Sequence, residues 1–364
     1  MLDPHEWTPE LIAQHSLDPR QFMDFRESTL PNGMRIIDAY NAGGLHYTLL
    51  PDRGLDIWTA HHKGIPLTWI AQGSPFPPDF GQTWLQQFNG GLLTTCGLTH
   101  VGPAEIGAVS GEVRDLHGRY SRLRAVEVAK AWGQDEYGLP FVELSGIIRE
   151  SALFGVQLRL TRTYRLYLNR PVITLHDVVT NLGDIAAPLM LLYHINVGFP
   201  LVTKGAQLHT PCRAVHPRDE AARKAADHWN IYDAPMTEFR EQVFFHHLAE
   251  QNGSTRVLLE NGKIGFEVSW DSSALPYFTQ WKNTRQGIYV NGIEPGNCIP
   301  EGQTAARHTG RLEMLAPDES REMTCAMTII EGVETLQTTK EQIEQLRLKG
   351  TPVEKCRLED YASE

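Results

Sequence analysis

Residues 156–168 read VQLRLTRTYRLYL, and this stretch decides the class of fold. Leucine and tyrosine side chains alternate with polar ones through thirteen positions, and a single charged residue, Arg162, interrupts the apolar row. A period of two is the spacing of a β-strand that buries one face, because successive side chains point to opposite sides. The pattern therefore predicts a long strand with its leucines in the core.

Similar runs surround this strand. Residues 34–39, 45–50 and 55–61 precede it, residues 172–180 and 188–197 follow it, and Gly, Pro, Asn and Asp separate the runs. Residues 307–313 and 323–330 are expected to be closing strands. Helical composition is confined to residues 219–229 and 340–348, the second with Thr338 and Thr339 as a possible cap. Many strands and few helices predict a mostly β, large antiparallel sandwich with peripheral helices.

The domain organisation follows from the same reading. Residues 1–29 are expected to form an N-terminal lead-in, residues 30–335 the sandwich, and residues 336–364 a C-terminal helical tail. We find no internal repeat and no low-complexity linker within the sandwich region.

Composition excludes several classes of function. The chain has 364 residues and a formal net charge of −11, which repels phosphate backbones and anionic lipid. No apolar run approaches the roughly 18 residues that span a bilayer. Residues 1–18 lack the basic and apolar segments of a signal peptide, so a cytoplasmic location is expected, without nucleic-acid or membrane partners. The sequence does not give the oligomeric state.

The cysteines point to a reducing compartment. There are five, scattered and without a CxxC pair, so neither a disulfide framework nor a zinc site is expected. The adjacent histidines at 61–62 and 246–247 would point to opposite faces of a strand and would not chelate one ion. We therefore expect no metal and no cofactor.

The most unusual segment is 289–298, YVNGIEPGNC. It reads as a strand end, with Glu294 just before a proline and a glycine. A carboxylate on backbone that proline stiffens is well placed as a fixed base. The alternative is a turn glutamate that faces water.

A histidine lies inside the apolar run 191–200, LLYHINVGFP. If the run is a strand, His194 and Asn196 lie on one face, and Tyr193 and Ile195 lie on the other. Such a pair could be an acid and the group that orients it. The alternative is a core histidine bound to a backbone carbonyl.

Two further segments contain candidate binding groups. His117 precedes a glycine, where backbone could approach a ligand closely, although a turn histidine in water is the plainer interpretation. The stretch 51–56, PDRGLD, places Arg53 and Asp56 around a tight turn. They could bind sugar hydroxyls or form an exposed ion pair. The glycine-rich stretch 89–100 ends in His100 and lacks a phosphate-binding motif.

Taken in order, these segments resemble the aldose 1-epimerase superfamily, in an uncharacterised branch. Its mutarotases have a His-Gly motif in the first half, then a strand histidine closely followed by asparagine, and a late glutamate before proline. The resemblance covers roughly residues 30–330 and implies a galactose mutarotase-like β-supersandwich.

The resemblance also implies roles for particular residues. Glu294 matches the general base, His194 the general acid, and His117 the histidine that polarises the ring oxygen. Arg53 resembles the family's substrate-binding arginine, and we expect it to keep the glutamate ionised. The residues assigned to substrate binding are Arg53, Asp56, His100, Asn196, Gln280 and Trp281.

The predicted function is a cofactor-independent isomerase that interconverts the anomers of an aldose, neutral or anionic. The sequence leaves two alternatives open. One is a sugar-binding or regulatory protein without catalysis, and the other is a different carbohydrate isomerase or epimerase on the same scaffold.

Overall fold

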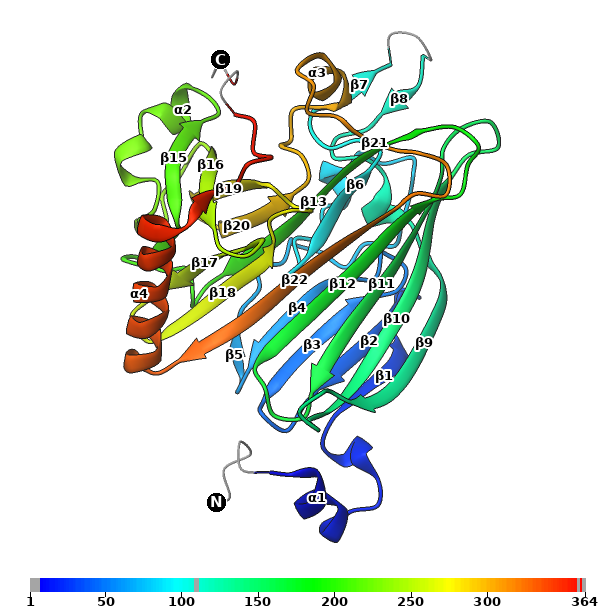
Figure 1. The fold of residues 1–364 in the computed structure, drawn as a ribbon, viewed down its shortest axis with the longest axis vertical. Helices are drawn as coiled ribbons and strands as arrows, with labels where there is room; N and C mark the ends of the chain where they lie inside the picture. Colours follow the sequence, from blue (N-terminus) through cyan, green and yellow to red (C-terminus); the bar gives the residue numbers. More distant parts are fainter. Residues whose placement is uncertain (1–6, 108–110, 359–360, 362–364) are drawn as a thin grey trace.

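Figure 1 shows the computed structural model of the chain, a β-protein with a few helices at its periphery. The structure describes residues 7–107, 111–358 and 361. The predicted N-terminal and C-terminal segments therefore lie partly outside the described residues, at 1–6, 359–360 and 362–364. The division into lead-in, sandwich and tail stays a prediction.

Within the described residues, the strands form three large antiparallel sheets and one small hairpin. The β1 sheet contains, in order, β1 (Asp24–Thr29), β2 (Arg35–Tyr40), β3 (Leu45–Leu50), β4 (Asp56–His62) and β5 (Ile65–Pro66). The β11 sheet contains, in order, β14 (Gln207–His209), β17 (Ser254–Glu260), β18 (Ile264–Asp271), β22 (Ser320–Glu331), β12 (Val172–Asn181), β11 (Gln157–Tyr167), β10 (Pro140–Ser151) and β9 (Ala125–Gln134).

The third sheet, the β13 sheet, bears the candidate site. Its main path is β15 (Cys212–Pro217), β16 (Gln242–Glu250), β19 (Tyr277–Arg285), β20 (Ile288–Gly296), β13 (Ala187–Gly198) and β21 (Glu313–Leu315). Two strands pair beside this path, β6 (Thr94–Leu98) with β13 and β23 (Thr351–Pro352) with β16. The small hairpin is β7 (Glu105–Ile106) with β8 (Val113–Arg114).

The helices are short except the last. They are α1 (Pro9–His15), α2 (Glu220–Arg223), α3 (Gln303–His308) and α4 (Val333–Lys349), with 3-10 turns at Pro19–Gln21, Leu85–Gln87, Tyr120–Arg122 and Ala226–His228. Figure 1 shows α4 packed beside β17 and β18 at one side of the molecule. It buries Leu336 and Ile343 against Leu258.

The alternation in 156–168 is realised in β11, where buried and half-buried positions alternate through Gln157–Tyr167. The leucines of β11 join one core with Tyr193 and Ile195 of β13 and Leu49 of β3, so the three large sheets share it. The predicted fold class is confirmed. The inward face of β13 belongs to this core, which leaves His194 on the opposite face of the sheet.

Two local predictions were wrong, and a third was right only in part. The expected strand at 307–313 is instead the end of α3, a turn and the first residue of β21, because Gly310 has a φ of 72° and interrupts any extended run. The last helix begins at Val333, and Thr338 and Thr339 donate to carbonyls four residues earlier rather than capping it. The helix predicted at 219–229 is present only in part, as the short helix α2 and the 3-10 turn Ala226–His228.

Candidate active site

Strand register brings the histidine and the glutamate together. Ile195 of β13 pairs with Ile293 of β20, so the next position places His194 opposite Glu294. On the other side of β20, Thr279 of β19 pairs with Glu294. Residues directly opposite in antiparallel strands have their side chains on the same face. His194, Glu294 and Thr279 therefore form one row across the β13 sheet.

The two ionisable side chains are in direct contact. His194 Nε2 lies 3.2 Å from Glu294 Oε1, and the two residues are only 6% and 3% exposed. Among the described residues, neither Glu294 Oε1 nor His194 Nδ1 has a partner in full hydrogen-bond geometry. The pair is thus close enough to exchange a proton and still has polar atoms available to a ligand.

Three more buried polar atoms at this face also lack hydrogen-bond partners in the described part of the chain. They are His117 Nδ1, Asn196 Oδ1 and Thr279 Oγ1. A buried polar atom without a partner is costly, so a group of them on one face is consistent with a site that binds a ligand, water or a proton. Thr279 was missed by the sequence reading because a threonine in a strand is ordinary.

Aromatic rings enclose the pair. His194 lies 5.3 Å from Trp281 and 5.4 Å from Phe88 between ring centroids. Phe88 stacks on Trp84 at 4.5 Å, and Trp84 contacts the ring of His117 at 4.9 Å. Trp84 and Phe88 flank the 3-10 turn Leu85–Gln87, in the segment that joins β5 to β6. Such apolar faces suit a sugar ring.

Burial sets the protonation of the site. It raises the pKa of Glu294 well above its ordinary value, and Glu241 raises it further while Arg218 lowers it. Burial lowers the pKa of His194 to about 4, although Asn196 opposes the change. Burial also lowers the pKa of His117 to about 3. The expectation of a glutamate kept ionised by Arg53 was wrong, because burial favours the neutral carboxyl and Arg218 is the cation that opposes it.

Two charged residues at the edge of the site had no sequence signal. Trp281 Nε1 donates to Glu241 at 2.8 Å, and Arg218 donates to both Glu241 and Asp219 at 3.0 Å. Glu241 and Arg218 act electrostatically on Glu294. Both lie outside any regular pattern, which is why only the folded chain identifies them.

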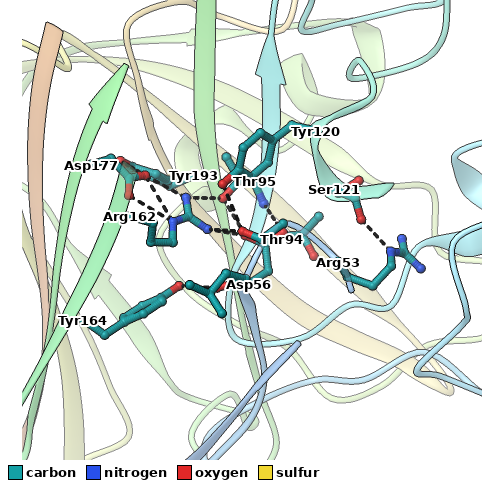
Figure 2. Close-up of polar contacts among 12 residues, drawn as sticks. Arg53, Asp56, Thr94, Thr95, Tyr120, Ser121, Arg162, Tyr164, Asp177 and Tyr193 are labelled. Atoms are coloured by element: carbon teal, nitrogen blue, oxygen red, sulfur yellow. Dashed lines mark hydrogen bonds and ion pairs between the residues drawn. The ribbon is translucent and has the colours of Figure 1, made fainter. Parts of the chain in front are cut away.

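Arg53 and Asp56 are bound within the protein (Figure 2). Arg53 is buried rather than exposed, and its three guanidinium nitrogens donate to the backbone carbonyls of Ser121, Phe76 and Gln87. Asp56 accepts from the backbone and side chain of Thr95 and from Arg162. These contacts suit support of the scaffold, and the structure does not bring either residue into the His194–Glu294 row.

Three other predicted residues also have partners within the chain. The His100 ring is within bonding distance of the Pro103 carbonyl and accepts from Gln303 N, and Gln280 contacts His246 and donates to Tyr232. Asn196 donates to the carbonyls of Gly91 and His194, and its Oδ1 has no hydrogen-bond partner among the described residues. Of the nine predicted residues, the structure therefore gathers Glu294, His194, His117, Asn196 and Trp281.

The glycine after His117 has a different use from the one expected. A side chain on Gly118 would come within 2.5 Å of the carbonyl oxygens of Gly97 and His100. The close approach is therefore to the protein's own backbone rather than to a ligand, and it fixes the loop from which His117 extends.

In the part of the chain that the structure describes, no three or more His, Cys, Asp or Glu side chains are grouped to hold a metal ion. No helix within the same residues has the length and apolarity to cross a membrane.

Solved structures with the same architecture place the fold in one class, the galactose mutarotase-like proteins. A Klebsiella pneumoniae protein provisionally named an aldose 1-epimerase has a TM-score of 0.81 at 23% identity, with 93% of this chain and 95% of that one covered. A galactose mutarotase-like protein of Clostridium acetobutylicum gives 0.62 at 16%, over 86% and 100% of the two chains. Galactose 1-epimerase of Lactobacillus acidophilus gives 0.57 at 14%, over 85% and 99%.

Within that class, the chain belongs to the family described as "Domain of unknown function (DUF4432)", whose model matches residues 31–329. The predicted galactose mutarotase-like fold is confirmed, and a family described only as a domain of unknown function agrees with an uncharacterised branch. No curated protein matches the chain in sequence. Because the structural relatives are less than 25% identical, they establish the fold and leave the activity to be argued from the site.

Proposed function

We propose that this protein is an aldose 1-epimerase, which interconverts the α and β anomers of a sugar by acid–base chemistry. The observation that carries the proposal is the 3.2 Å contact between His194 Nε2 and Glu294 Oε1 on a face lined by aromatic rings. Opening a pyranose needs one group to take the proton of the anomeric hydroxyl and another to protonate the ring oxygen. An adjacent carboxyl and imidazole can supply both.

The pair needs one proton between its two members. Burial disfavours net charge, and the singly protonated pair is neutral overall whichever residue holds the proton. In ring opening, Glu294 as the carboxylate takes the hydroxyl proton while protonated His194 gives its proton to the ring oxygen. Ring closure on the other face reverses both transfers. His117 can accept or donate at the ring oxygen through Nδ1, and no covalent intermediate is needed.

The surroundings favour a neutral aldose over an anionic one. Trp281 offers an apolar face, and Asn196 Oδ1 and Thr279 Oγ1 can bond hydroxyls. Arg218, the guanidinium that acts on Glu294, already has two carboxylate partners. The described cysteines form no disulfide bond, which fits a cytoplasmic enzyme.

The test is anomer exchange measured by NMR saturation transfer on a panel of neutral and anionic aldoses. We expect Glu294→Gln to lower the exchange rate by about 10²–10⁴-fold, the usual contribution of one acid or base group. The matched control is Glu267→Gln in β18, since Glu267 is also a buried glutamate whose pKa burial raises, and it lies in the β11 sheet. It should leave the rate unchanged.

The outcomes separate the alternatives. Exchange by the wild type that Glu294→Gln abolishes supports the epimerase. Folded wild type that binds a sugar without accelerating exchange would favour the sugar-binding alternative. Equal losses in both glutamine variants would mean that a buried glutamate is needed for folding and not for proton transfer.

A further inference from the structure

The strand that contains Glu294 has a glycine two residues earlier, and its position is unusual. Gly292 of β20 lies directly between Asn196 of β13 and Trp281 of β19. This row is adjacent to the row of His194 and Glu294, and both rows face the same way, because residues two apart in a strand share a face. On the site face, the side chains of Asn196 and Trp281 therefore have a residue without a side chain between them.

The carboxyl of Glu294 occupies that position. A Cβ built on Gly292 would lie 2.5 Å from Glu294 Oε1 and 2.9 Å from the Cβ of Trp281. Real Cβ atoms do not approach other atoms closer than about 3 Å, so any side chain here displaces the carboxyl. The glutamate thus folds back along its own strand and packs where a side chain of residue 292 would be.

The reason for glycine here is space and not backbone conformation. Gly292 is absent from the glycines with positive φ, and it lies within the regular pairing of β20. Alanine is therefore allowed by the backbone at this position. Glycine inside a strand is less stable than alanine, so its presence in β20 points to a compensating role.

We infer that Gly292 is a positioning residue for the proposed proton transfer: its missing side chain forms the cradle that holds the Glu294 carboxyl against His194. The inference rests on the proposed function for its kinetic consequences. The geometric part of the inference is that residue 292 sets the distance between the Glu294 carboxyl and the His194 ring. This part does not depend on which sugar is bound.

The kinetic test is Gly292→Ala, alone and combined with Glu294→Gln. We expect Gly292→Ala to lower kcat at least 10-fold with little change in KM, because the carboxyl leaves its place while the aromatic walls remain. In the Glu294→Gln background the same change should lower the residual rate no further, since a residue that acts through the carboxylate has nothing left to position. Additive losses, or an unchanged kcat in Gly292→Ala, would overturn the inference.

The control is Gly265→Ala in β18. A Cβ there would meet the side chains of Leu336 and Leu258 at 2.6 and 2.8 Å, a similar steric load in a strand outside the site. Its kcat should remain that of the wild type. If Gly265→Ala lowers kcat as much as Gly292→Ala does, the loss comes from general strain and the inference fails.

A readout without activity separates this inference from the proposed function. The titration of the His194 ring, followed by NMR, should move in Gly292→Ala to the midpoint it has in Glu294→Gln. An unchanged midpoint overturns the inference even if the enzyme is inactive on every sugar tried. Wild type without exchange activity, combined with a shifted midpoint in Gly292→Ala, would reject the epimerase and keep Gly292 as the residue that places the carboxyl.

Discussion

Replacing Arg162 by methionine should be among the most destabilising single changes in the β11 sheet. Figure 2 shows its guanidinium between Asp177 and Asp56. The side chain is fully buried and donates to Asp177 at 2.7 and 3.0 Å, to Asp56 at 2.6 Å and to Thr95 at 2.8 Å. Burial alone would lower the pKa of Arg162, but Asp177 and nearby tyrosines raise it well above its ordinary value.

The expected cost is about 3–5 kcal/mol of unfolding free energy, the usual penalty when one partner of a buried ion pair is removed. Methionine fills most of the space, so the loss comes from two carboxylates without a cation. Burial already raises the pKa of Asp56, and removing Arg162 removes a cation that lowers it. The folded state then binds protons more tightly than the unfolded state, so the deficit should shrink as the pH falls through the raised pKa of Asp56.

The assay is urea unfolding followed by tryptophan fluorescence, with Arg165→Met as the control on the same strand. Arg165 is 36% exposed in its side chain, pairs with Glu143 at 2.8 Å and lies over Phe141. We expect the control to cost about 1 kcal/mol. Equal costs for the two variants, or a deficit for Arg162→Met that does not change with pH, would refute the argument from buried charge.

Two further predictions concern the pH dependence of activity and the segment that contains Trp84 and Phe88. The rate of anomer exchange should follow a bell-shaped pH profile. Activity should be lost as the pH falls through about 4, because His194 then adds a second proton to the pair. Activity should also be lost at high pH, because Glu294 ionises above its raised pKa. A rate that rises steadily with pH would contradict the shared proton. Arg53→Met should leave carbonyls in the segment before β6 without partners, costing about 1–3 kcal/mol, and should speed amide hydrogen exchange around Trp84 and Phe88. Unchanged amide hydrogen exchange around Trp84 and Phe88 would show that Arg53 does not keep this segment in place.

Much of the candidate site could be predicted because its residues lie in local patterns. His194 and Asn196 share a strand face by the period of two, and Glu294 precedes a proline at the end of β20. The pairing of these strands joins residues about a hundred positions apart, and nothing local in either strand states the register. The places of Thr279 and Gly292 in the site could be recognised only once that register was known.

Arg53 shows where local reading fails. Its turn looks like an exposed hairpin, and a guanidinium beside a carboxylate suggests a surface pair or a sugar contact. The fold buries it against backbone carbonyls from two distant loops, and no pattern in the chain announces which loops will meet.

By itself the sequence determined the β class of this protein, because alternation in stretches such as 156–168 is a property of neighbouring residues and survives in any strand that buries one face. The tertiary structure decided the rest. They turned the single break in that alternation, Arg162, into the centre of a buried ion cluster, and they raised the pKa of Glu294 by removing it from water. Both effects depend on which distant segments surround a side chain, and burial and strand register are settled only when the sheets pack together.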